Sequence, residues 1–292
     1  MHVTVLGCGY VGTELARQLL DAGHEVTAVR RSEAGVATLR NAGIDARRAD
    51  VTDPSTLADL PGTDAVVFAA SSGGRGADAA REVFVRGLEN AVTEYAERAD
   101  SPERLVYTSS TGVYGDHGGE WVGEETTVEA TTEKTAVLVD AERVARDADA
   151  FDATVVRFAG LYGPDRYRLE RYLEGPVVEG YLNMLHRDDA AGVLRFALET
   201  GVDVPVLLAV DDEPVSKPAF ATWLADQCGV DRPAVETVAE RLARRDLSAA
   251  AERRLRTSKR CSNRRLRNLG YDFAFPTFRA GYRPAIEAYR KQ

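Results

Sequence analysis

Three glycines near the start of the chain have the spacing of a phosphate-binding turn. The segment Gly7-Cys8-Gly9-Tyr10-Val11-Gly12 directly follows the apolar run Val3–Leu6 and opens a stretch with helical periodicity. In such a turn the first glycine allows a tight bend and the second lets backbone amides approach a pyrophosphate, while the third permits close packing of helix on strand. The N-terminus of the helix then attracts the phosphates. The segment therefore predicts a dinucleotide-binding site that includes Tyr10 and Val11.

Two arginines and a serine follow the second apolar run, at the point where the type of dinucleotide is usually selected. Val26–Val29 is succeeded by Arg30, Arg31 and Ser32. An NAD-specific site carries an acid here that holds the ribose 2′-hydroxyl, whereas guanidinium groups and a hydroxyl suit a 2′-phosphate. We therefore expect NADP as the cofactor and leave NAD open. The alternative is a pair of solvated arginines on a loop.

The elements that must position these residues alternate along the first 210 residues. Short apolar runs followed by Gly, Ser, Arg or Asp are typical of buried parallel strands, and they lie at Val3–Leu6, Glu25–Val29, Ala65–Ala70, Leu105–Thr108, Thr154–Phe158 and Val206–Val210. Helices are expected between them at Val11–Ala22, Ala79–Arg98, Thr135–Ala148 and Asp188–Thr200. This alternation predicts an α/β fold with a Rossmann doubly wound parallel sheet.

The alternation of strands and helices ends after Asp211-Asp212-Glu213-Pro214. Helices are expected near Pro218–Cys228 and Val235–Arg245, and no strong strand is expected in this tail. Together with an insertion, the tail forms a small, mostly helical C-terminal substrate lobe in this interpretation. The expected boundaries are 1–164 and 183–211 for the NAD(P)-binding Rossmann domain, and 165–182 and 212–292 for the lobe.

Five further segments, in order, resemble the extended short-chain dehydrogenases/reductases of the NAD-dependent epimerase/dehydratase type. The resemblance covers roughly residues 1–215 and rests on Ala49-Asp50-Val51-Thr52-Asp53, Phe68-Ala69-Ala70-Ser71, the "SS…VYG" signature in 105–115, the "R…YGP" turn in 157–164 and the "N..H..D.A" run of Asn183 with His186-Arg187-Asp188-Asp189-Ala190-Ala191. It implies that Asp50 reads the exocyclic amine of adenine. It also implies cofactor contacts from Val51, Ala69, Ala70, Ser71, Thr108, Phe158 and Gly160.

The catalytic residues depart from the pattern of that family. The family pairs a serine or threonine, here Ser110, with a Tyr-x-x-x-Lys motif whose tyrosine donates or accepts the proton. If the chain is aligned on Glu142, Lys134 takes the tyrosine position and Leu138 the lysine position. If Lys134 is aligned on the lysine instead, Ala130 takes the tyrosine position. The tyrosine is absent under either alignment, so the chain resembles an atypical branch.

Lys134 is the candidate replacement, provided that desolvation lowers its pKa. The alternatives are His117 and the acids Glu120, Glu124 and Glu125, which follow the "SS…VYG" signature. The expected function is an NAD(P)-dependent oxidoreductase or epimerase-like enzyme that acts on a small polar molecule, and an anionic substrate is left open. The competing hypothesis is an NADP-binding redox-sensing or interaction protein without turnover.

The charge of the chain is unevenly distributed. The formal net charge is -9, with 37 Lys and Arg residues against 46 Asp and Glu, which argues against a nucleic-acid partner. Between Arg241 and Arg267, however, eleven basic residues face only Asp246 and Glu252. This segment is either a solvated helix face or a wall that attracts an anionic substrate.

Several kinds of protein do not fit the composition. The 3 cysteines and 4 histidines show no spacing typical of a disulfide framework or a metal site. No apolar run approaches the length of about 18 residues that indicates a membrane span, so no membrane partner is expected. The N-terminus has no features of a signal peptide, and we expect a cytoplasmic protein. A homodimer is left open.

Overall fold

The computed structural model describes residues 1–73, 76–244 and 246–291, which form two compact units. The first unit comprises residues 1–113, 128–158 and 187–209, and the second comprises 114–127, 159–186 and 210–292. Both segments expected for the lobe, 165–182 and 212–292, lie in the second unit. That unit also takes residues 114–127, which follow the "SS…VYG" serines, and the residues that flank the insertion.

The first unit contains a parallel sheet of seven strands. The strand order is β12-β7-β5-β4-β1-β2-β3, and the strands are β1 (His2–Leu6), β2 (Glu25–Arg30), β3 (Ala46–Arg48), β4 (Ala65–Phe68), β5 (Arg104–Ser110), β7 (Asp152–Phe158) and β12 (Val206–Ala209). The predicted doubly wound Rossmann sheet is thus confirmed. Only β3 had not been expected, because it has three residues, and two of them are exposed arginines that leave no apolar run.

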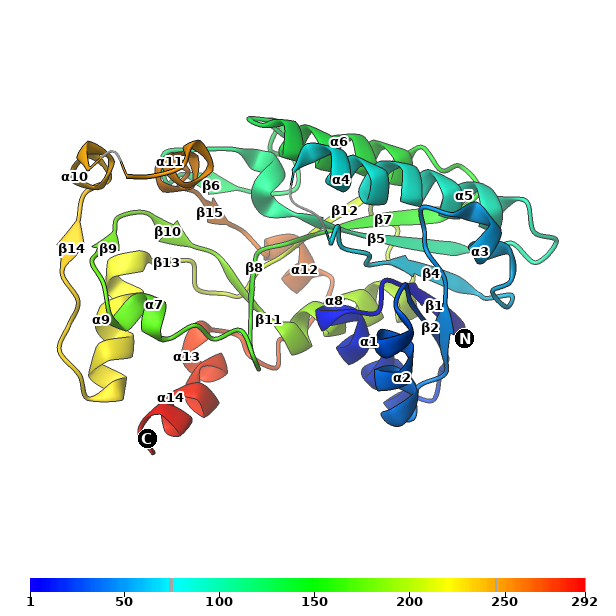
Figure 1. Ribbon diagram of the computed structural model, residues 1–292, viewed down its shortest axis with the longest axis horizontal. Coiled ribbons are helices and arrows are strands. Elements are labelled where there is room, and N and C mark those ends of the chain that lie inside the picture. Colours follow the sequence, from blue (N-terminus) through cyan, green and yellow to red (C-terminus); the bar gives the residue numbers. More distant parts are fainter. Residues whose placement is uncertain (74–75, 245, 292) are drawn as a thin grey trace. The chain divides into compact units, whose positions relative to one another are not determined.

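Helices cover both faces of this sheet, as Figure 1 shows. On one face lie α1 (Tyr10–Asp21), α2 (Glu33–Asn41) and α8 (Arg187–Glu199), and on the other lie α4 (Ala77–Arg81), α5 (Gly87–Ala96) and α6 (Glu133–Arg146). The short helix α3 (Pro54–Ala58) follows β3. This two-sided cover explains why the strands read as continuous apolar runs, since a parallel sheet is buried on both faces.

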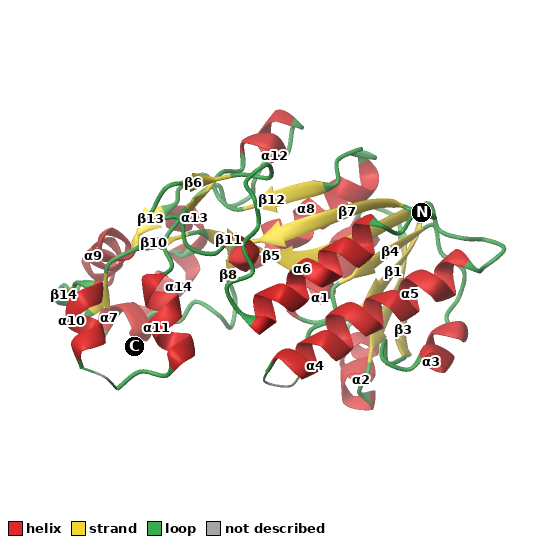
Figure 2. Ribbon diagram, turned by 90° about the horizontal axis from the view of Figure 1, so that it is seen from above, coloured by secondary structure: helices red, strands yellow, loops and turns green. Residues whose placement is uncertain are grey.

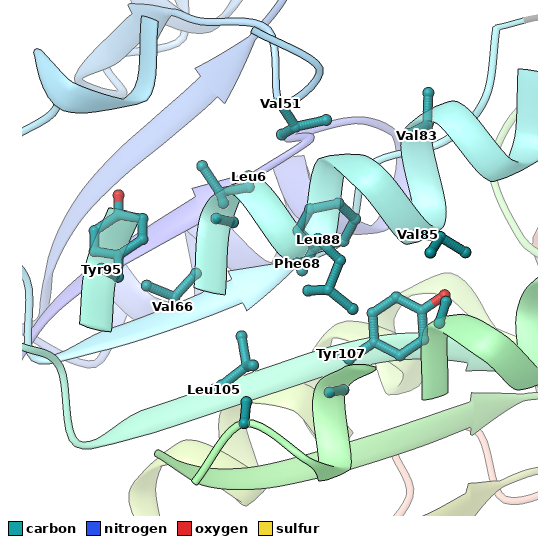
Figure 3. Packing of buried hydrophobic residues seen from close by; sticks show 14 of the residues in the cluster. Leu6, Val51, Val66, Phe68, Val83, Val85, Leu88, Tyr95, Leu105 and Tyr107 are labelled. Atoms are coloured by element: carbon teal, nitrogen blue, oxygen red, sulfur yellow. The ribbon is translucent and has the colours of Figure 1, made fainter. Parts of the chain in front are cut away.

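One hydrophobic cluster of the first unit lies between the sheet and the α4–α6 side (Figure 3). Leu6, Phe68 and Tyr107, from three adjacent strands, are at most 1% exposed and pack with Leu88 of α5. The phenol of Tyr107 finds no hydrogen-bond partner among the residues that the structure describes. Burial raises its pKa well above the ordinary value, so Tyr107 cannot replace the missing catalytic tyrosine.

The helix expected at Ala79–Arg98 consists of three consecutive segments. A π-helical turn, η1 (Glu82–Arg86), joins α4 to α5, and such wide turns are frequent near functional sites. The first residue of α5 is Gly87, at which a Cβ would lie only 2.7 Å from Val51 Cγ2. The glycine therefore allows the helical segment to approach the loop that follows β3.

The second unit combines short strands with short helices (Figure 2). Its own core contains Phe220, Leu224, Phe278 and Tyr282. The strands are β6 (Trp121–Val122), β8 (Gly160–Tyr162), β9 (Val177–Val178), β10 (Tyr181–Leu182), β11 (Met184–His186), β13 (Val215–Ser216), β14 (Val235–Glu236) and β15 (Arg260–Cys261). The helices are α7 (Glu170–Leu173), α9 (Lys217–Cys228), α10 (Val238–Ala243), α11 (Ala249–Arg256), α12 (Arg264–Asn268), α13 (Phe278–Gly281) and α14 (Arg283–Tyr289), and the 3₁₀ turn η2 (Thr111–Tyr114) leads into this unit.

The tail differs from its prediction in two respects. Strands β13, β14 and β15 have two residues each, too few to leave a periodic pattern. The helix expected at Val235–Arg245 begins later, at Val238, because Thr237 forms a capping box with Glu240. The end of that prediction, Arg245, lies outside the described residues.

The composition led to expectations about membrane spans and about the cysteines. None of the helices in the described ranges combines the length and the apolar character needed to cross a bilayer. Cys8, Cys228 and Cys261 are all buried free thiols.

Candidate cofactor and active site

The glycine loop connects β1 to α1 in a conformation that depends on Gly7. This residue has φ +88°, and a Cβ on it would collide with the backbone of Ala70 after β4. The amides of Gly7 and Cys8 both donate to the carbonyl of Val29, at 3.2 and 2.9 Å. The bend is therefore tied to β2 and packed against the end of β4, which leaves no space for a side chain.

The other two glycines have different roles. Gly9 is the N-cap of α1 and provides no capping side chain, so the positive end of the helix dipole is not screened by a side chain of its own cap. A Cβ on Gly12 would lie 3.2 Å from both Gly7 O and Val5 Cγ1, as expected for close packing of helix on strand. Tyr10 and Val11 form the first turn of α1 with Gly12.

Arg30 and Arg31 lie in different environments although they are adjacent in sequence. The Arg30 guanidinium donates to Cys8 O at 3.1 Å, and it lies 3.3 Å from the position that a Cβ on Gly9 would take. The Arg31 side chain is 65% exposed, and its Nε lies 3.9 Å from Asp50 Oδ2. Arg30 thus supports the glycine loop, while Arg31 remains available to a ligand.

Asp50 and Ser32 are held by local hydrogen bonds. Asp50 Oδ1 accepts from the amide and the hydroxyl of Thr52, at 3.0 and 2.8 Å. The Ser32 hydroxyl caps α2 by accepting from the Gly35 amide at 3.2 Å. Both side chains therefore have defined orientations in the first unit.

These segments enclose an open cleft of about 240 Å³. Its lining includes nine of the predicted cofactor residues, namely Gly7, Gly9, Arg30, Arg31, Ser32, Asp50, Val51, Ala70 and Ser71. The sequence interpretation missed Val29, Ala49, Gly73 and Val83, which also line it. Val29 and Ala49 directly precede predicted site residues and could have been found from that position. Val83 could not, because its place depends on the π-helical turn.

The remaining predicted cofactor residues do not line this cleft. Tyr10, Val11 and Gly12 lie in the first turn of α1, and Ala69 is bonded to β1 through its amide, which donates to Leu6 O at 2.8 Å. Thr108 lies in β5 and Phe158 ends β7, whereas Gly160 belongs to the second unit.

The cleft fits a dinucleotide phosphate chemically. Gly9, the N-cap of α1, lines it, and its cations are the guanidinium groups of Arg30 and Arg31. Burial raises the pKa of the Cys8 thiol to about 11, so this cysteine stays neutral beside the loop. No negative charge from the thiol therefore opposes a phosphate.

The end of β5 brings Ser110 to the edge of the sheet. Its half-buried hydroxyl accepts from the Gly112 amide at 3.1 Å, and the preceding Ser109 donates to Glu142 Oε1 at 2.6 Å. Glu142 also binds Arg157 of β7, at 2.9 Å to Nε and 2.6 Å to Nη2. In the sequence, Glu142 served only to align α6 with the family's motif. Its ion pair with Arg157 could not be predicted from local spacing.

Lys134 lies in the first turn of α6 and is exposed. It shares one side of the helix with Leu138 and Glu142 because these residues are four apart. Exposure decreases along this stripe, from Lys134 through the half-buried Leu138 to the buried Glu142. In the alignment on Glu142, the position of the tyrosine is therefore solvent-accessible, and the desolvation that was expected for Lys134 is not found.

The alternative acid–base residues all belong to the second unit. His117 Nε2 lies 2.8 Å from Tyr114 O, and Glu125 is exposed and paired with Arg265. Glu120 is exposed and Glu124 is half-buried. In the basic segment, Arg241, Arg244, Arg265 and Arg267 each pair with an acid, as expected for a solvated surface, and Arg245 lies outside the described residues. No group of three or more His, Cys, Asp or Glu side chains in the described ranges could hold a metal ion.

Several known proteins are similar to this chain in sequence. A family model described as NAD(P)H-binding matches residues 7–200. Protein YeeZ of Escherichia coli K12 is 30% identical over 205 residues, which cover 68% of this chain and 73% of that protein. A 2-alkyl-3-oxoalkanoate reductase of Stenotrophomonas maltophilia is 31% identical over 190 residues, which cover 61% and 56% of the two chains.

Solved structures with a similar fold cover the whole length of this chain. A structure from Methylobacillus flagellatus assigned to the NAD-dependent epimerases/dehydratases has 29% identity and a TM-score of 0.79, with 100% of this chain and 99% of that chain covered. The human epimerase family protein SDR39U1, solved with NADPH, has the same fold, with 22% identity, a TM-score of 0.78 and full coverage of both chains. This chain therefore belongs to the NAD(P)H-binding family, and its similarity to an epimerase/dehydratase structure is consistent with the extended short-chain dehydrogenase/reductase type.

Proposed function

We propose that this protein is an NADP-dependent reductase of small oxo acids. One observation carries the choice of cofactor: the Arg31 guanidinium lines the same cleft as the glycine loop, directly after β2. No carboxylate is among the side chains at residues 30–32. A 2′-phosphate would bring its negative charge to this exposed cation, whereas a 2′-hydroxyl would make a weaker, neutral hydrogen bond.

The bound cofactor would supply the hydride, and the chain would supply the proton and the binding groups. We assign the substrate hydroxyl or carbonyl to the Ser110 hydroxyl, which the Gly112 amide orients. We propose Lys134 as the proton donor because it takes the tyrosine position in the alignment on Glu142. Its side chain is exposed and therefore not desolvated, contrary to expectation. The buried pair of Glu142 and Arg157 keeps α6 in register with β7 and β5.

The substrate class is taken from the name of a relative. The Stenotrophomonas maltophilia relative is named for reduction of a 2-alkyl-3-oxoalkanoate, a molecule with a ketone and a carboxylate. We therefore propose oxo acids rather than neutral ketones.

Binding of NADPH and NADH, measured by calorimetric titration, tests the cofactor. We expect NADPH to bind at least about tenfold more tightly, since one charge-assisted contact contributes about 1.5–3 kcal/mol. Arg31→Ala should remove most of that preference and leave NADH affinity unchanged. Arg47→Ala is the matched control, because Arg47 is also exposed but lies on β3 outside the cleft. Equal affinity of the parent protein for both cofactors would contradict the proposal.

Turnover tests the reaction itself. NADPH oxidation is followed with a panel of 2-oxo and 3-oxo acids, and the corresponding methyl ketones that lack the carboxylate serve as controls. We expect turnover with the acids only. Tight NADPH binding without turnover of any panel member would instead favour a redox-sensing or interaction protein. That second candidate is supported by the alignment on Glu142, in which Lys134 and Leu138 replace the tyrosine and the lysine of the family.

A further inference from the structure

A groove in the second unit is lined by two segments that are distant in sequence. Residues 121–126 contribute one part of its lining, and α12 with its flanking residues contributes the other. All of these residues belong to the second unit, and the groove has a volume of about 710 Å³. Pockets of this size accommodate small molecules. We call it the Trp121 groove.

Trp121 presents its indole at the surface because of its place in β6. Side chains alternate between the two faces of a strand, and the neighbouring Val122 is 2% exposed, so the side chain of Trp121 points outward and is 54% exposed. The Arg260 guanidinium lies 5.1 Å from the centroid of the indole ring. Arg260 Nε in turn donates to the carbonyl of Gly119 at 2.7 Å. The indole is therefore supported by a fixed neighbour and still offers an aromatic surface to the groove.

Helix α12 turns both polar and apolar side chains to the groove. Its buried residue is Leu266, which is 0% exposed. The residues that line the groove form two adjacent rows with a spacing of four, namely Arg264 with Asn268 and Arg265 with Leu269. Leu269 is 38% exposed. Two large exposed hydrophobic side chains, those of Trp121 and Leu269, thus line one groove, and such a concentration is typical of a binding surface.

The two arginines of this groove differ in their partners. Arg265 forms an ion pair with Glu125, from the other part of the lining. Arg264 is exposed, and within the described part of the chain no side chain or carbonyl lies within hydrogen-bond or ion-pair distance of its guanidinium. Arg264 is thus the cation of the lining that remains available to a ligand.

The charges of the lining favour a ligand with a single negative charge. Glu124 and Glu125 line the groove as well, so a phosphate with nearly two negative charges would be repelled by two acids and attracted by one available guanidinium. A carboxylate carries one charge and accepts two parallel hydrogen bonds from a guanidinium. An aromatic ring on the same molecule would gain from stacking on the indole.

We propose that the Trp121 groove binds an aromatic carboxylate. The ring of the ligand would contact Trp121 and Leu269, and its carboxylate would accept from Arg264. The groove lies wholly in the second unit, apart from the residues of the cofactor cleft. The inference therefore does not depend on the choice of cofactor or on the proposed reaction.

Nuclear magnetic resonance of ¹⁹F tests this site directly, because the chain has only two tryptophans, Trp121 and Trp223. Protein labelled with 5-fluorotryptophan should give two signals, and Trp121→Phe removes one and so assigns both. Trp223 lies in α9 and does not line the groove, so its signal is the internal reference. The probe is 2-naphthoate. We expect the Trp121 signal to shift to saturation while the Trp223 signal stays.

Three related compounds test the chemistry of the ligand. The amide 2-naphthamide lacks the charge, cyclohexanecarboxylate lacks the aromatic ring, and 2-naphthyl phosphate carries a second charge. We expect 2-naphthamide to bind at least about tenfold more weakly than 2-naphthoate, because it loses a charge-assisted contact. The other two compounds should also bind more weakly. Equal binding of the amide, or tighter binding of the phosphate or of cyclohexanecarboxylate, would overturn the proposed ligand class.

A variant of the free arginine tests the proposed contact. Arg264→Met should weaken binding of 2-naphthoate about tenfold and leave binding of 2-naphthamide unchanged. Arg283→Met is the matched control, because Arg283 is also exposed and forms no ion pair with a described residue. It should change neither affinity, and NADPH affinity should be the same in both variants. If 2-naphthoate causes no saturable shift of the Trp121 signal, the inference is wrong, whatever the NADPH titration shows.

Discussion

Glu142 and Arg157 form a bidentate ion pair that joins α6 to β7 in the interior of the first unit. The side chains are 1% and 5% exposed, and Ser109 of β5 donates to the same carboxylate. Three elements of the active-site edge therefore meet at one glutamate. The stripe of α6 that carries Lys134 depends on this contact for its position.

Removing the charge of Glu142 should destabilise the protein strongly. In Glu142→Gln the buried guanidinium loses its counter-charge, and breaking such a pair costs about 3–5 kcal/mol. Unfolding in urea measures the change. Glu82→Gln provides the comparison, because Glu82 pairs with Arg86 on the surface and should cost less than about 1 kcal/mol. A similar small loss in both variants would show that the buried pair does not carry the stability assigned to it.

Gly9→Val should abolish cofactor binding in a folded protein, whereas Gly7→Ala should destabilise the fold. At Gly9 a Cβ would lie 3.3 Å from the end of the Arg30 side chain and at an ordinary 3.8 Å from Gly7 O, so in Gly9→Val the fold should persist while the side chain fills the space for the pyrophosphate. Gly7→Ala clashes with the backbone of Ala70 at positive φ and should cost about 2 kcal/mol or more. Thermal unfolding and NADPH fluorescence report the two effects. Normal NADPH binding by a folded Gly9→Val protein would place the cofactor elsewhere.

Asp211 should make the stability of the protein fall as the pH rises. Its carboxyl is 1% exposed, and Oδ2 has no hydrogen-bond partner among the described residues. Burial raises its pKa to about 8, above the value of about 4 in the unfolded chain. The folded state therefore holds a proton that the unfolded state releases, so stability decreases between about pH 4 and pH 8.

Asp211→Asn should remove this dependence. Urea unfolding at pH 5, 7 and 9 should show a gain for the variant at pH 9 relative to pH 5 of at least about 1.4 kcal/mol, which corresponds to one pKa unit. Asp59→Asn, at an exposed position, serves as the control. Parallel pH profiles of the parent and the Asp211→Asn protein would mean that Asp211 is ionised in the folded state.

Lys134 should be required for turnover and not for cofactor binding. Lys134→Met removes the proposed proton donor and should lower kcat by the 10²- to 10⁴-fold typical of a lost acid–base group. Lys134→Arg keeps the charge but cannot release its proton, so it should be as slow as the methionine variant. Full turnover in the arginine variant would indicate an electrostatic role for Lys134. Full turnover in both variants would show that Lys134 has no role in the reaction.

Much of the cofactor cleft could be predicted from short stretches of sequence. The glycine loop and the run Arg30 to Ser32 lie at the ends of predicted strands, and parallel strands bring their carboxyl ends to one edge of the sheet. Asp50 and Val51 were expected from the family resemblance alone. The strand runs were recognisable because burial on both faces requires continuous apolar residues. Strand β3 was missed since its exposed arginines leave no such run, and Val83 was missed since its position depends on a π-helical turn.

What the sequence determined by itself was therefore local: which segments become strands and helices, and which backbone positions must lack a side chain. Pairings between distant segments were decided only in the tertiary structure. Glu142 meets Arg157 across a helix and a strand, and Lys259 meets the carbonyl of Gly115, 144 positions away. Local periodicity reports which face of an element is buried, but the partner of a buried charge is set by the packing of whole elements. Lys259, an apparent member of a solvated basic run, is buried, which could not be deduced before the fold was known.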